Sequence, residues 1–369
     1  RRGLSVTIIE SESAIWTRAS LHNEGKVHLG HVYALGGART RRTLLVDAVA
    51  FADEIENALG ESVDWSAIRT PEFRYIVMPD SQLSVDALAA RYREINEAYR
   101  DLGTPPYLGE ALDSLAEPTP TLDDQSGLPC FTTAERAVDP IALRAIISDR
   151  IDRDPRIEVA LSSEVLRVAQ SDGAALVEVE SGGAVLTLQA RIVIDCRWEN
   201  QGADIEGRGR ETRNIRVKAA VRLLTDSSVP TATLVAGPYG DLVQHRDYAY
   251  VSWYPEARLH HEFALSPSPS AERELSSVGS QSVVDAQLNA LRRFGWLQGK
   301  VEVLGGVGGF ILGSGAHDIA HPDSLLHDRH ASGLERFGAV LLPRSFKFSS
   351  APAVARRAAE AAARQASIL

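Results

Sequence analysis

Cysteine, excess positive charge and long apolar runs are all scarce in this sequence. The two cysteines, Cys130 and Cys196, lie far apart, which gives no metal framework and fits a reducing compartment. The formal net charge of −10 argues against a nucleic-acid backbone as the main partner, but a locally basic pocket could still bind an anionic small molecule. Because no run of about 18 apolar residues occurs, we predict no membrane span. No signal peptide is visible, so we expect a cytoplasmic protein.

The length and composition predict a globular protein with more than one domain. The chain has 369 residues, of which 44% are hydrophobic and 24% charged. Hydrophobic periodicity predicts helices over residues 43–59, 84–102, 139–153 and 281–298, and from Pro352 onward. Strands are predicted over residues 4–10, 72–79, 216–224, 232–237, 248–254, 259–265, 301–312 and 339–342, with short strands within 157–198. Residues 13–37, 103–129 and 266–270 are predicted loops, and the first is long enough to indicate a function.

Two apolar segments have a more specific interpretation. Residues Arg191–Asp195 are apolar on both faces, which is typical of a buried parallel strand. The run Gly305–Gly309 superficially resembles a phosphate loop, but its spacing is not G-x-G-x-x-G. We therefore predict a glycine-rich strand that lies close to another backbone.

The first residues, RRGLSVTIIESE, contain the most informative motif. A basic stretch ends in glycine and is followed by an apolar strand with Glu10 at its tip. This is typical of the second strand of a dinucleotide-binding unit, where a carboxylate accepts two hydrogen bonds from the ribose diol. The glycine-rich turn that should come about 20 residues earlier is not in the sequence. Taken alone, the motif allows NAD or FAD, and Glu10 could also be an ordinary acidic residue at the end of a surface strand.

Three segments, in this order, resemble one protein family. They are VTIIESESAIWTRASLHNEGKVHLG from Val6, SSEVLRV from Ser162 followed by ARIVIDCRW, and FGAVLLPRSFKFSSAPAVARRAAEA from Phe337. Together they are similar to FAD-dependent oxidoreductases of the D-amino-acid oxidase and glycine oxidase superfamily. The sequence departs from the family at the absent glycine-rich turn and at residues 344–346, where glycine is usual. Because the other cofactor segments are present, we expect the turn to lie upstream of Arg1.

The resemblance implies an α/β fold with a Rossmann-like, discontinuous FAD-binding domain and an inserted mixed or antiparallel β-sheet substrate domain. The implied FAD-binding domain comprises residues 1–60, 130–200 and 325–369, and the substrate domain comprises 61–129 and 201–324. The implied activity is oxidation of a small amine, amino-acid or hydroxy-acid-type substrate by hydride transfer to flavin N5. Two alternatives remain open: a non-catalytic binding or assembly module of the same fold, and an NAD(P)H-dependent flavin monooxygenase.

The resemblance also implies which residues contact FAD. Backbone amides and small side chains suit phosphate and flavin carbonyls, and a lysine at a helix N-terminus suits the negative charge of reduced flavin. The same residues could instead form a polar surface loop and an ordinary helix cap. The predicted cofactor-binding residues are Glu10, Ser20, Asn23, Gly25, Lys26, Val165, Lys347, Phe348, Ser349 and Ser350.

The candidate catalytic residues are His28, Arg74 and Tyr254. His28 follows the cofactor loop, while an arginine with a neighbouring tyrosine could clamp a substrate carboxylate. Each could equally be structural: a packed loop histidine, an exposed strand arginine and a core aromatic. His317 and His321 have a helical metal-ligand spacing, but the preceding glycines indicate a loop, and we predict no metal site.

Overall fold

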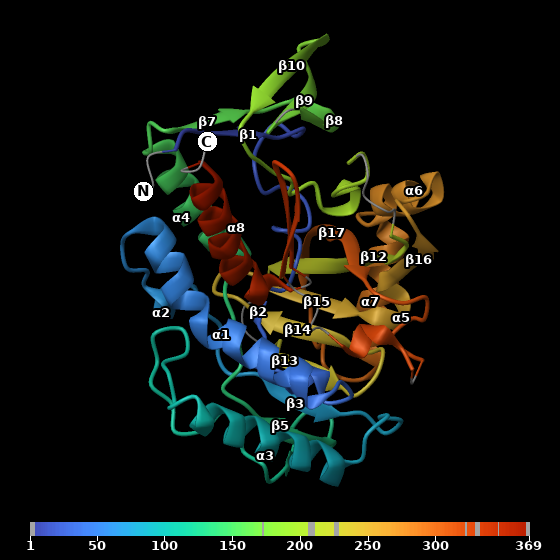
Figure 1. Ribbon diagram of the computed structural model, residues 1–369. Helices are drawn as coiled ribbons and strands as arrows, with labels where there is room; N and C mark the ends of the chain where they lie inside the picture. Colours follow the sequence, from blue (N-terminus) through green and yellow to red (C-terminus); the bar gives the residue numbers. More distant parts are fainter. Residues whose placement is uncertain are drawn as a thin grey trace.

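The computed structural model describes residues 4–171, 173–205, 211–224, 229–321, 323–328, 333–345 and 347–366. Residues 1–3 and Phe346, which belong to two of the sequence motifs, lie outside this part. Figure 1 shows a large sheet with helices on its faces, and a group of short strands near helix α8 (Ala351–Ala366). Both chain ends lie beside this second group.

The described residues include a nine-stranded mixed sheet. Eight strands follow the order β16-β12-β15-β14-β13-β3-β5-β4. Strands β16 and β15 pair with the two halves of one edge of β12, and β17 pairs along its opposite edge. All neighbours are antiparallel except β13 and β3. The strands are β3 (Arg74–Val77), β4 (Thr121–Leu122), β5 (Pro129–Thr132), β12 (Arg213–Leu224), β13 (Ala232–Val235), β14 (Gly240–Gln244), β15 (Ala249–Trp253), β16 (Arg258–Ala264) and β17 (Glu302–Gly313).

The glycines of β17 allow a close backbone approach, as predicted. A Cβ atom on Gly306 would lie 2.3 Å from the Val278 carbonyl oxygen, and one on Gly308 would lie 2.6 Å from the Lys218 carbonyl oxygen. Any side chain at these positions would push neighbouring backbone away. The glycines therefore let β17 pack tightly between β12 and the segment before α7.

Shorter strands form four further sheets in the described residues. Strand β1 (Val6–Ile9) pairs in parallel with β7 (Ile157–Ala160), and β11 (Val193–Ile194) pairs in parallel with β19 (Val340–Arg344). The antiparallel pairs join β18 (Gly333–Phe337) to β19, β2 (Lys26–Val27) to β6 (Arg136–Ala137), and β8 (Ser163–Ser171), β9 (Ala174–Ser181) and β10 (Ala184–Ala190) into a meander. The expected parallel strand at 191–195 is thus present but shorter, and Ile194 is 42% exposed rather than buried.

Most predicted helices are present, and capping residues explain where they begin or end. The Asp139 side chain accepts the Ile141 amide before α4, and Gly60 ends α1 at φ +78°. The α-helices are α1 (Ala38–Leu59), α2 (Trp65–Ile68), α3 (Val85–Asp101), α4 (Pro140–Asp152), α5 (Tyr254–Ala257), α6 (Pro269–Ser277), α7 (Gln281–Arg293) and α8. The 3₁₀ turns are η1 (His31–Tyr33), η2 (Trp198–Asn200), η3 (Leu325–His327) and η4 (Phe348–Ser350). In the described residues, no helix combines the length and apolar character needed to cross a bilayer.

Several local boundaries were wrong. The segments predicted as loops at 13–37 and 103–129 contain the short strands β2 and β4. The loop predicted at 266–270 ends early, because Ser268 accepts the Ala271 amide and Pro269 begins α6. The helix predicted to reach residue 298 ends at Arg293, because Gly295 follows with φ +78°.

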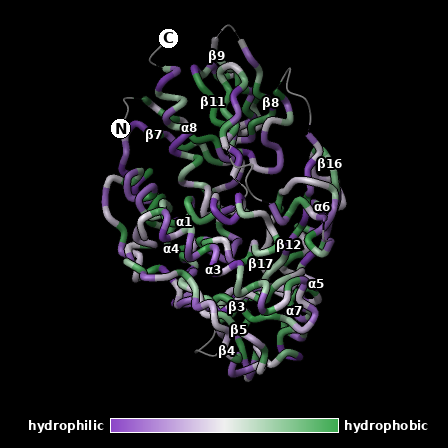
Figure 2. Tube along the Cα trace, turned by 60° about the horizontal axis from the view of Figure 1, so that its bottom comes forward, coloured by the Kyte–Doolittle hydropathy of each residue, from purple (hydrophilic) through white to green (hydrophobic). Residues whose placement is uncertain are grey.

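The large sheet separates two hydrophobic cores. Residues from α1 and α3 pack on the face that carries Tyr75, and residues from α7 pack on the face that carries Ile76. Figure 2 shows hydrophobic and hydrophilic residues alternating along helices and strands, as elements with one buried face require. The first of these faces is the one that meets the loop after β1.

Candidate functional site

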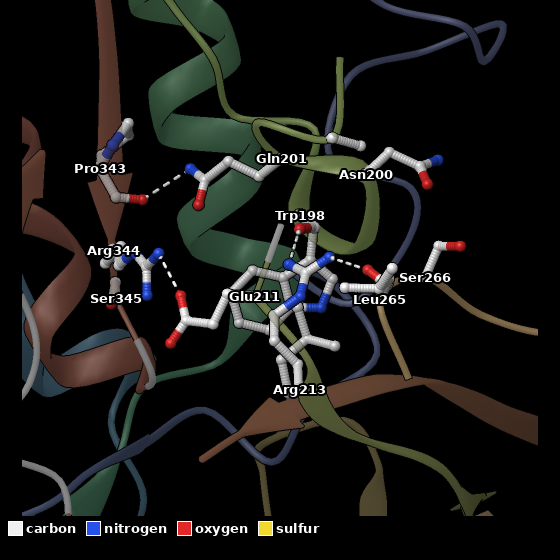
Figure 3. Close-up of a pocket in the computed structure, with 12 residues that line it drawn as sticks. Trp198, Asn200, Gln201, Glu211, Arg213, Leu265, Ser266, Pro343, Arg344 and Ser345 are labelled. Atoms are coloured by element: carbon white, nitrogen blue, oxygen red, sulfur yellow. Dashed lines mark hydrogen bonds and ion pairs between the residues drawn. The ribbon is translucent and has the colours of Figure 1, made fainter. Parts of the chain in front are cut away.

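A cavity of about 240 Å³ lies beyond the carboxyl ends of β11 and β19. Ligands of open α/β sheets bind at this position. Figure 3 shows Gln201 pointing to the Pro343 carbonyl, with 2.8 Å between donor and acceptor, and Arg344 pointing to Glu211 at 2.6 Å. Gln201 also donates to the Asp195 carbonyl at 2.7 Å, so it ties the two strand ends together. The cavity is lined by Trp198, Asn200, Gln201, Ala203, Glu211, Arg213, Leu265, Ser266, Leu312, Pro343, Arg344 and Ser345.

The segment after this cavity carries the predicted flavin-contacting residues. The Ser345 hydroxyl donates to the Lys347 carbonyl at 2.7 Å, and η4 then leads into α8. The Lys347 ammonium lies 5.1 Å from the centre of the Tyr33 ring. Phe348 packs on Phe51 with 5.3 Å between ring centres, so its side chain belongs to the core. The side chain is only partly buried, so a contact of Phe348 with flavin stays a prediction.

Ser349 and Ser350 are both buried at the start of α8. Ser350 forms a hydrogen bond with Asp47, whereas the Ser349 hydroxyl oxygen has no hydrogen-bond partner among the described residues. Buried hydroxyls are normally paired, so an unpaired one indicates a missing partner such as water or a ligand.

The loop before β2 is organised by its own side chains. The Asn23 amide donates to the Ala19 and Ser20 carbonyls, at 3.0 and 2.9 Å, and its oxygen accepts the Gly25 amide at 2.8 Å. Gly25 has φ +73°, and a Cβ atom there would lie 1.9 Å from the Val138 carbonyl oxygen. Asn23 and Gly25 therefore fix the shape of the loop, and the contact with a cofactor predicted for them would involve the backbone.

Lys26 leads from this loop into a buried charge cluster. Its ammonium lies 2.5 Å from both the Thr233 hydroxyl and an Asp241 carboxylate oxygen, and Lys218 lies 3.7 Å from the other oxygen. Burial disfavours the charge on Lys26, but Asp241 and other nearby carboxylates outweigh this and raise its pKa. Burial likewise disfavours ionised Asp241, and the two lysines hold its pKa well below the usual range.

Glu24 and Lys347 complete the buried charge cluster, which we define as Glu24, Lys26, Lys218, Asp241 and Lys347. Burial raises the pKa of Glu24, but the surrounding lysines, Lys218 above all, lower it overall. The cluster therefore joins the loop before β2, two strands of the large sheet and the segment before α8. The loop and the segment before α8 are each more than 100 residues from the two strands in the sequence, and the ion pair of Lys26 with Asp241 spans 215 positions.

Glu24, Lys218 and Asp241 were not predicted from the sequence, although one signal was available. The chain has 39 lysines and arginines, and only Lys26, Lys218, Lys300 and Lys347 are lysines. Three of these four belong to the buried charge cluster. A compact ammonium can be packed against carboxylates in a small space, whereas the planar guanidinium needs a wider one. In an arginine-rich chain, the rare lysines are therefore candidates for packing against buried carboxylates.

The structure does not bring the three candidate catalytic residues together. His28 is buried beside Glu135, with its Nδ1 atom 3.4 Å from a carboxylate oxygen. Arg74 pairs with Asp123 at 2.9 Å, on the sheet face opposite to that of Tyr75 and the cluster.

Tyr254, the third candidate, donates to Asp318 at 2.7 Å and lies 3.1 Å from an Arg216 nitrogen. Of the three candidates, only His28 lies in the segment that directly follows the loop before β2. For Arg74 and Tyr254, a role in substrate binding stays a prediction.

The remaining predicted contacts lie near the short parallel strands. Glu10 follows β1, and its carboxylate accepts the Glu12 amide at 3.0 Å and the Ser11 hydroxyl at 3.2 Å. Val165 lies in β8, where its partly buried side chain packs on the core beneath β19. The stacked rings of His317 and His321, 4.0 Å apart, lie in a loop as predicted, and the described residues contain no group of side chains suited to a metal ion.

We compared the sequence and the structure of the chain with those of known proteins. No family model and no curated protein matches the sequence. L-amino acid deaminase from Proteus myxofaciens has a similar structure, with a TM-score of 0.64 and 10% identity over 99% of this chain and 86% of that chain. Glycine oxidase from Geobacillus kaustophilus matches with a TM-score of 0.58 and 11% identity over 97% and 88%. L-α-glycerophosphate oxidase from Mycoplasma pneumoniae, solved with FAD bound, matches with 0.56 and 12% over 97% and 88%.

At 10–12% identity, these similarities establish the fold. The chain has the α/β fold of these three proteins, with a Rossmann-like part built from the short parallel strands. The fold predicted from the three sequence segments is therefore confirmed, including the mixed sheet that follows them.

Proposed function

We propose that the protein is a FAD-dependent oxidoreductase that oxidises a small amine, amino-acid or hydroxy-acid-type substrate, with the flavin accepting a hydride at N5. The observation that carries this proposal is the position of Lys347. Its ammonium has no ion-pair partner within 4 Å among the described residues, and it lies between the cavity at the strand ends and the start of α8. An unpaired cation at a helix N-terminus favours a ligand that carries or gains negative charge.

The side chains present fit FAD. The Glu10 carboxylate, at the end of a parallel strand, is an acceptor suited to ribose hydroxyls. At the other end of the site, the unpaired Ser349 hydroxyl and Lys347 supply a donor and a positive charge for the polar edge of the flavin. Between them, the backbone of residues 20–26 and the strand of Val165 would hold the rest of the dinucleotide.

The chain's own groups would bind and orient the substrate and exclude water. Lys218 and Asp241 each keep 14% of their side-chain area exposed, while Lys26 keeps 1%. Lys218 and Asp241 are therefore accessible to a polar substrate group, whereas Lys26 is not and instead fixes the position of Asp241. Lys347 would stabilise the negative charge that the flavin gains when the substrate is oxidised.

The test is a spectroscopic titration of the full-length protein. We expect flavin absorbance and one FAD released per chain, or uptake of added FAD, and anaerobic bleaching by at least one small amine or hydroxy acid. A protein that stays colourless in excess FAD would refute the proposal. Flavin that no small substrate bleaches, with a co-purifying protein, would favour a binding or assembly module. Oxygen uptake that depends on NADPH would favour a monooxygenase.

A further inference from the structure

The carboxylate of Glu135, which precedes β6, contacts several residues of the segment that follows β2. Its side chain is fully buried, and each oxygen has a strong donor: the Tyr75 hydroxyl at 2.5 Å on Oε1 and the Leu29 amide at 2.7 Å on Oε2. The Nδ1 atoms of two histidines face the same carboxylate, His28 at 3.4 Å from Oε1 and His31 at 3.6 Å from Oε2. Glu135 thus organises the whole stretch between the buried charge cluster and η1.

The surroundings of Glu135 and His28 determine which of these two groups is charged. Burial opposes the charge of Glu135, but the two histidines and Lys26 hold its pKa well below the usual range. Burial, assisted by Lys347, lowers the pKa of His28. At neutral pH, therefore, an ionised carboxylate faces a neutral imidazole.

A neutral imidazole has a single N–H, and an ionised carboxylate can only accept a hydrogen bond. The Nδ1 atom of His28 is buried without a hydrogen bond among the described residues, and it faces the Glu135 carboxylate at 3.4 Å. The carboxylate favours a proton on Nδ1 over one on Nε2, which then keeps its lone pair. The edge of the ring contacts Tyr33 at 5.8 Å between centres, and Tyr33 in turn lies under the Lys347 ammonium. His28 thus lies between the buried carboxylate and the proposed flavin-contacting lysine.

We propose that Glu135 is a positioning residue that fixes His28 in the Nδ1–H tautomer, so that Nε2 accepts the proton of the substrate. This inference rests on the proposed oxidation. As the substrate C–H bond gives its hydride to the flavin, the N–H or O–H proton passes to Nε2, and an imine or carbonyl product remains. FAD is the only oxidant required. The imidazolium that forms is stabilised by Glu135 at 3.4 Å.

The first test needs no substrate. Imidazole ¹⁵N NMR of the protein as purified reports the tautomer of each histidine, and His28→Gln identifies the signal of His28. We expect Nδ1 protonated and Nε2 bare in the wild type, and a mixture of tautomers in Glu135→Gln. The matched control is Asp123→Asn, which neutralises another fully buried carboxylate, the partner of Arg74, and should leave the His28 signal unchanged.

If Glu135→Gln fails to fold, the wild-type spectrum and Tyr75→Phe still decide the question. Tyr75→Phe removes a hydrogen bond of Glu135 but keeps its charge, so the tautomer should be retained. A wild-type His28 with its proton on Nε2 would overturn the inference. So would a signal that is the same in Glu135→Gln as in the wild type.

The second test measures anaerobic flavin reduction across pH. We expect His28→Gln to lower the rate about 100-fold, in the range for loss of a general base. Glu135→Gln should lower it roughly 10-fold with little change in KM, and should move the acidic limb of the profile to lower pH, because the charge that favours imidazolium is gone. A colourless protein with the expected tautomer would refute the proposed function alone. Normal reduction in both variants would refute this inference alone.

Discussion

The ion pair of Lys26 with Asp241 should be more sensitive to substitution than an exposed ion pair. Lys26 exposes 1% of its side chain, and its ammonium lies 2.5 Å from Asp241, which also faces Lys218 at 3.7 Å. Removing one partner of a buried pair costs about 3–5 kcal/mol, because the other charge stays buried without compensation. Asparagine at position 241 keeps an oxygen acceptor, and the site is 14% exposed, so we expect Asp241→Asn to cost about 3 kcal/mol, the lower end.

The assay is urea unfolding followed by tryptophan fluorescence, since Trp253 and Trp296 are buried in the core between the large sheet and α7. The control is Glu61→Gln, which breaks a pair with Arg153 at 3.1 Å in which both side chains are about half exposed. This control should cost less than about 1 kcal/mol. If both variants shift the midpoint equally, the buried pair contributes no more than a surface pair, and the reasoning is wrong.

The pH dependence of this difference has a defined sign. The pKa of Asp241 is lowered on folding, so its contribution is complete above the unfolded pKa, about 3.9, and is lost as the pH falls below it. The pKa of Lys26 is raised, so its contribution is complete below the unfolded pKa, about 10.4, and is lost at still higher pH. The gap between wild type and Asp241→Asn should therefore stay constant from about pH 5 to 9 and shrink in acid. A gap that widens below pH 4 would contradict this assignment.

Three further results are expected. Gly25→Ala should lower the urea midpoint by more than Gly103→Ala, because both glycines have positive φ but only Gly25 would meet a carbonyl oxygen, at 1.9 Å; equal shifts would refute the clash. Glu10→Ala and Lys347→Met should each weaken FAD binding about 10- to 100-fold in fluorescence titrations, as expected for lost hydrogen bonds to charged groups, with Glu12→Ala as the unaffected control. The buried Cys130 thiol, with its pKa raised to about 11 by burial, should resist alkylation at pH 8 until urea unfolds the protein; rapid labelling of the native protein would show that the site opens.

The sequence predicted those parts of the fold that depend on neighbouring residues. Asp139 with Pro140 marked the start of α4, Gly60 marked the end of α1, and the glycines of β17 indicated close backbone packing. Strand β14 was not predicted, since its five residues, GDLVQ, carry a weak local pattern and are held by β13 and β15.

Only the parts of the candidate site that are continuous in the sequence could be predicted. Residues 20–28 and 347–350 were identified from their motifs, but their partners Asp241 and Lys218 come from strands that no spacing rule connects to them. Arg74 lies next to an aromatic residue on a strand, and alternation places its side chain on the opposite face from that aromatic. Side-chain direction within a predicted strand could be inferred, but which face meets the cofactor loop depends on tertiary packing.

The separation of 215 positions between Lys26 and Asp241 also affects synthesis of the chain. At 5–20 residues per second, a ribosome needs roughly 10–40 s to make strand β14 after Lys26 has been added. During that time the lysine has no access to its strongest counter-ion, and the loop that it anchors cannot take its final form. The loop before β2 is therefore translated well before the strand that completes its contacts. Over that interval it would be open to chaperones and proteases.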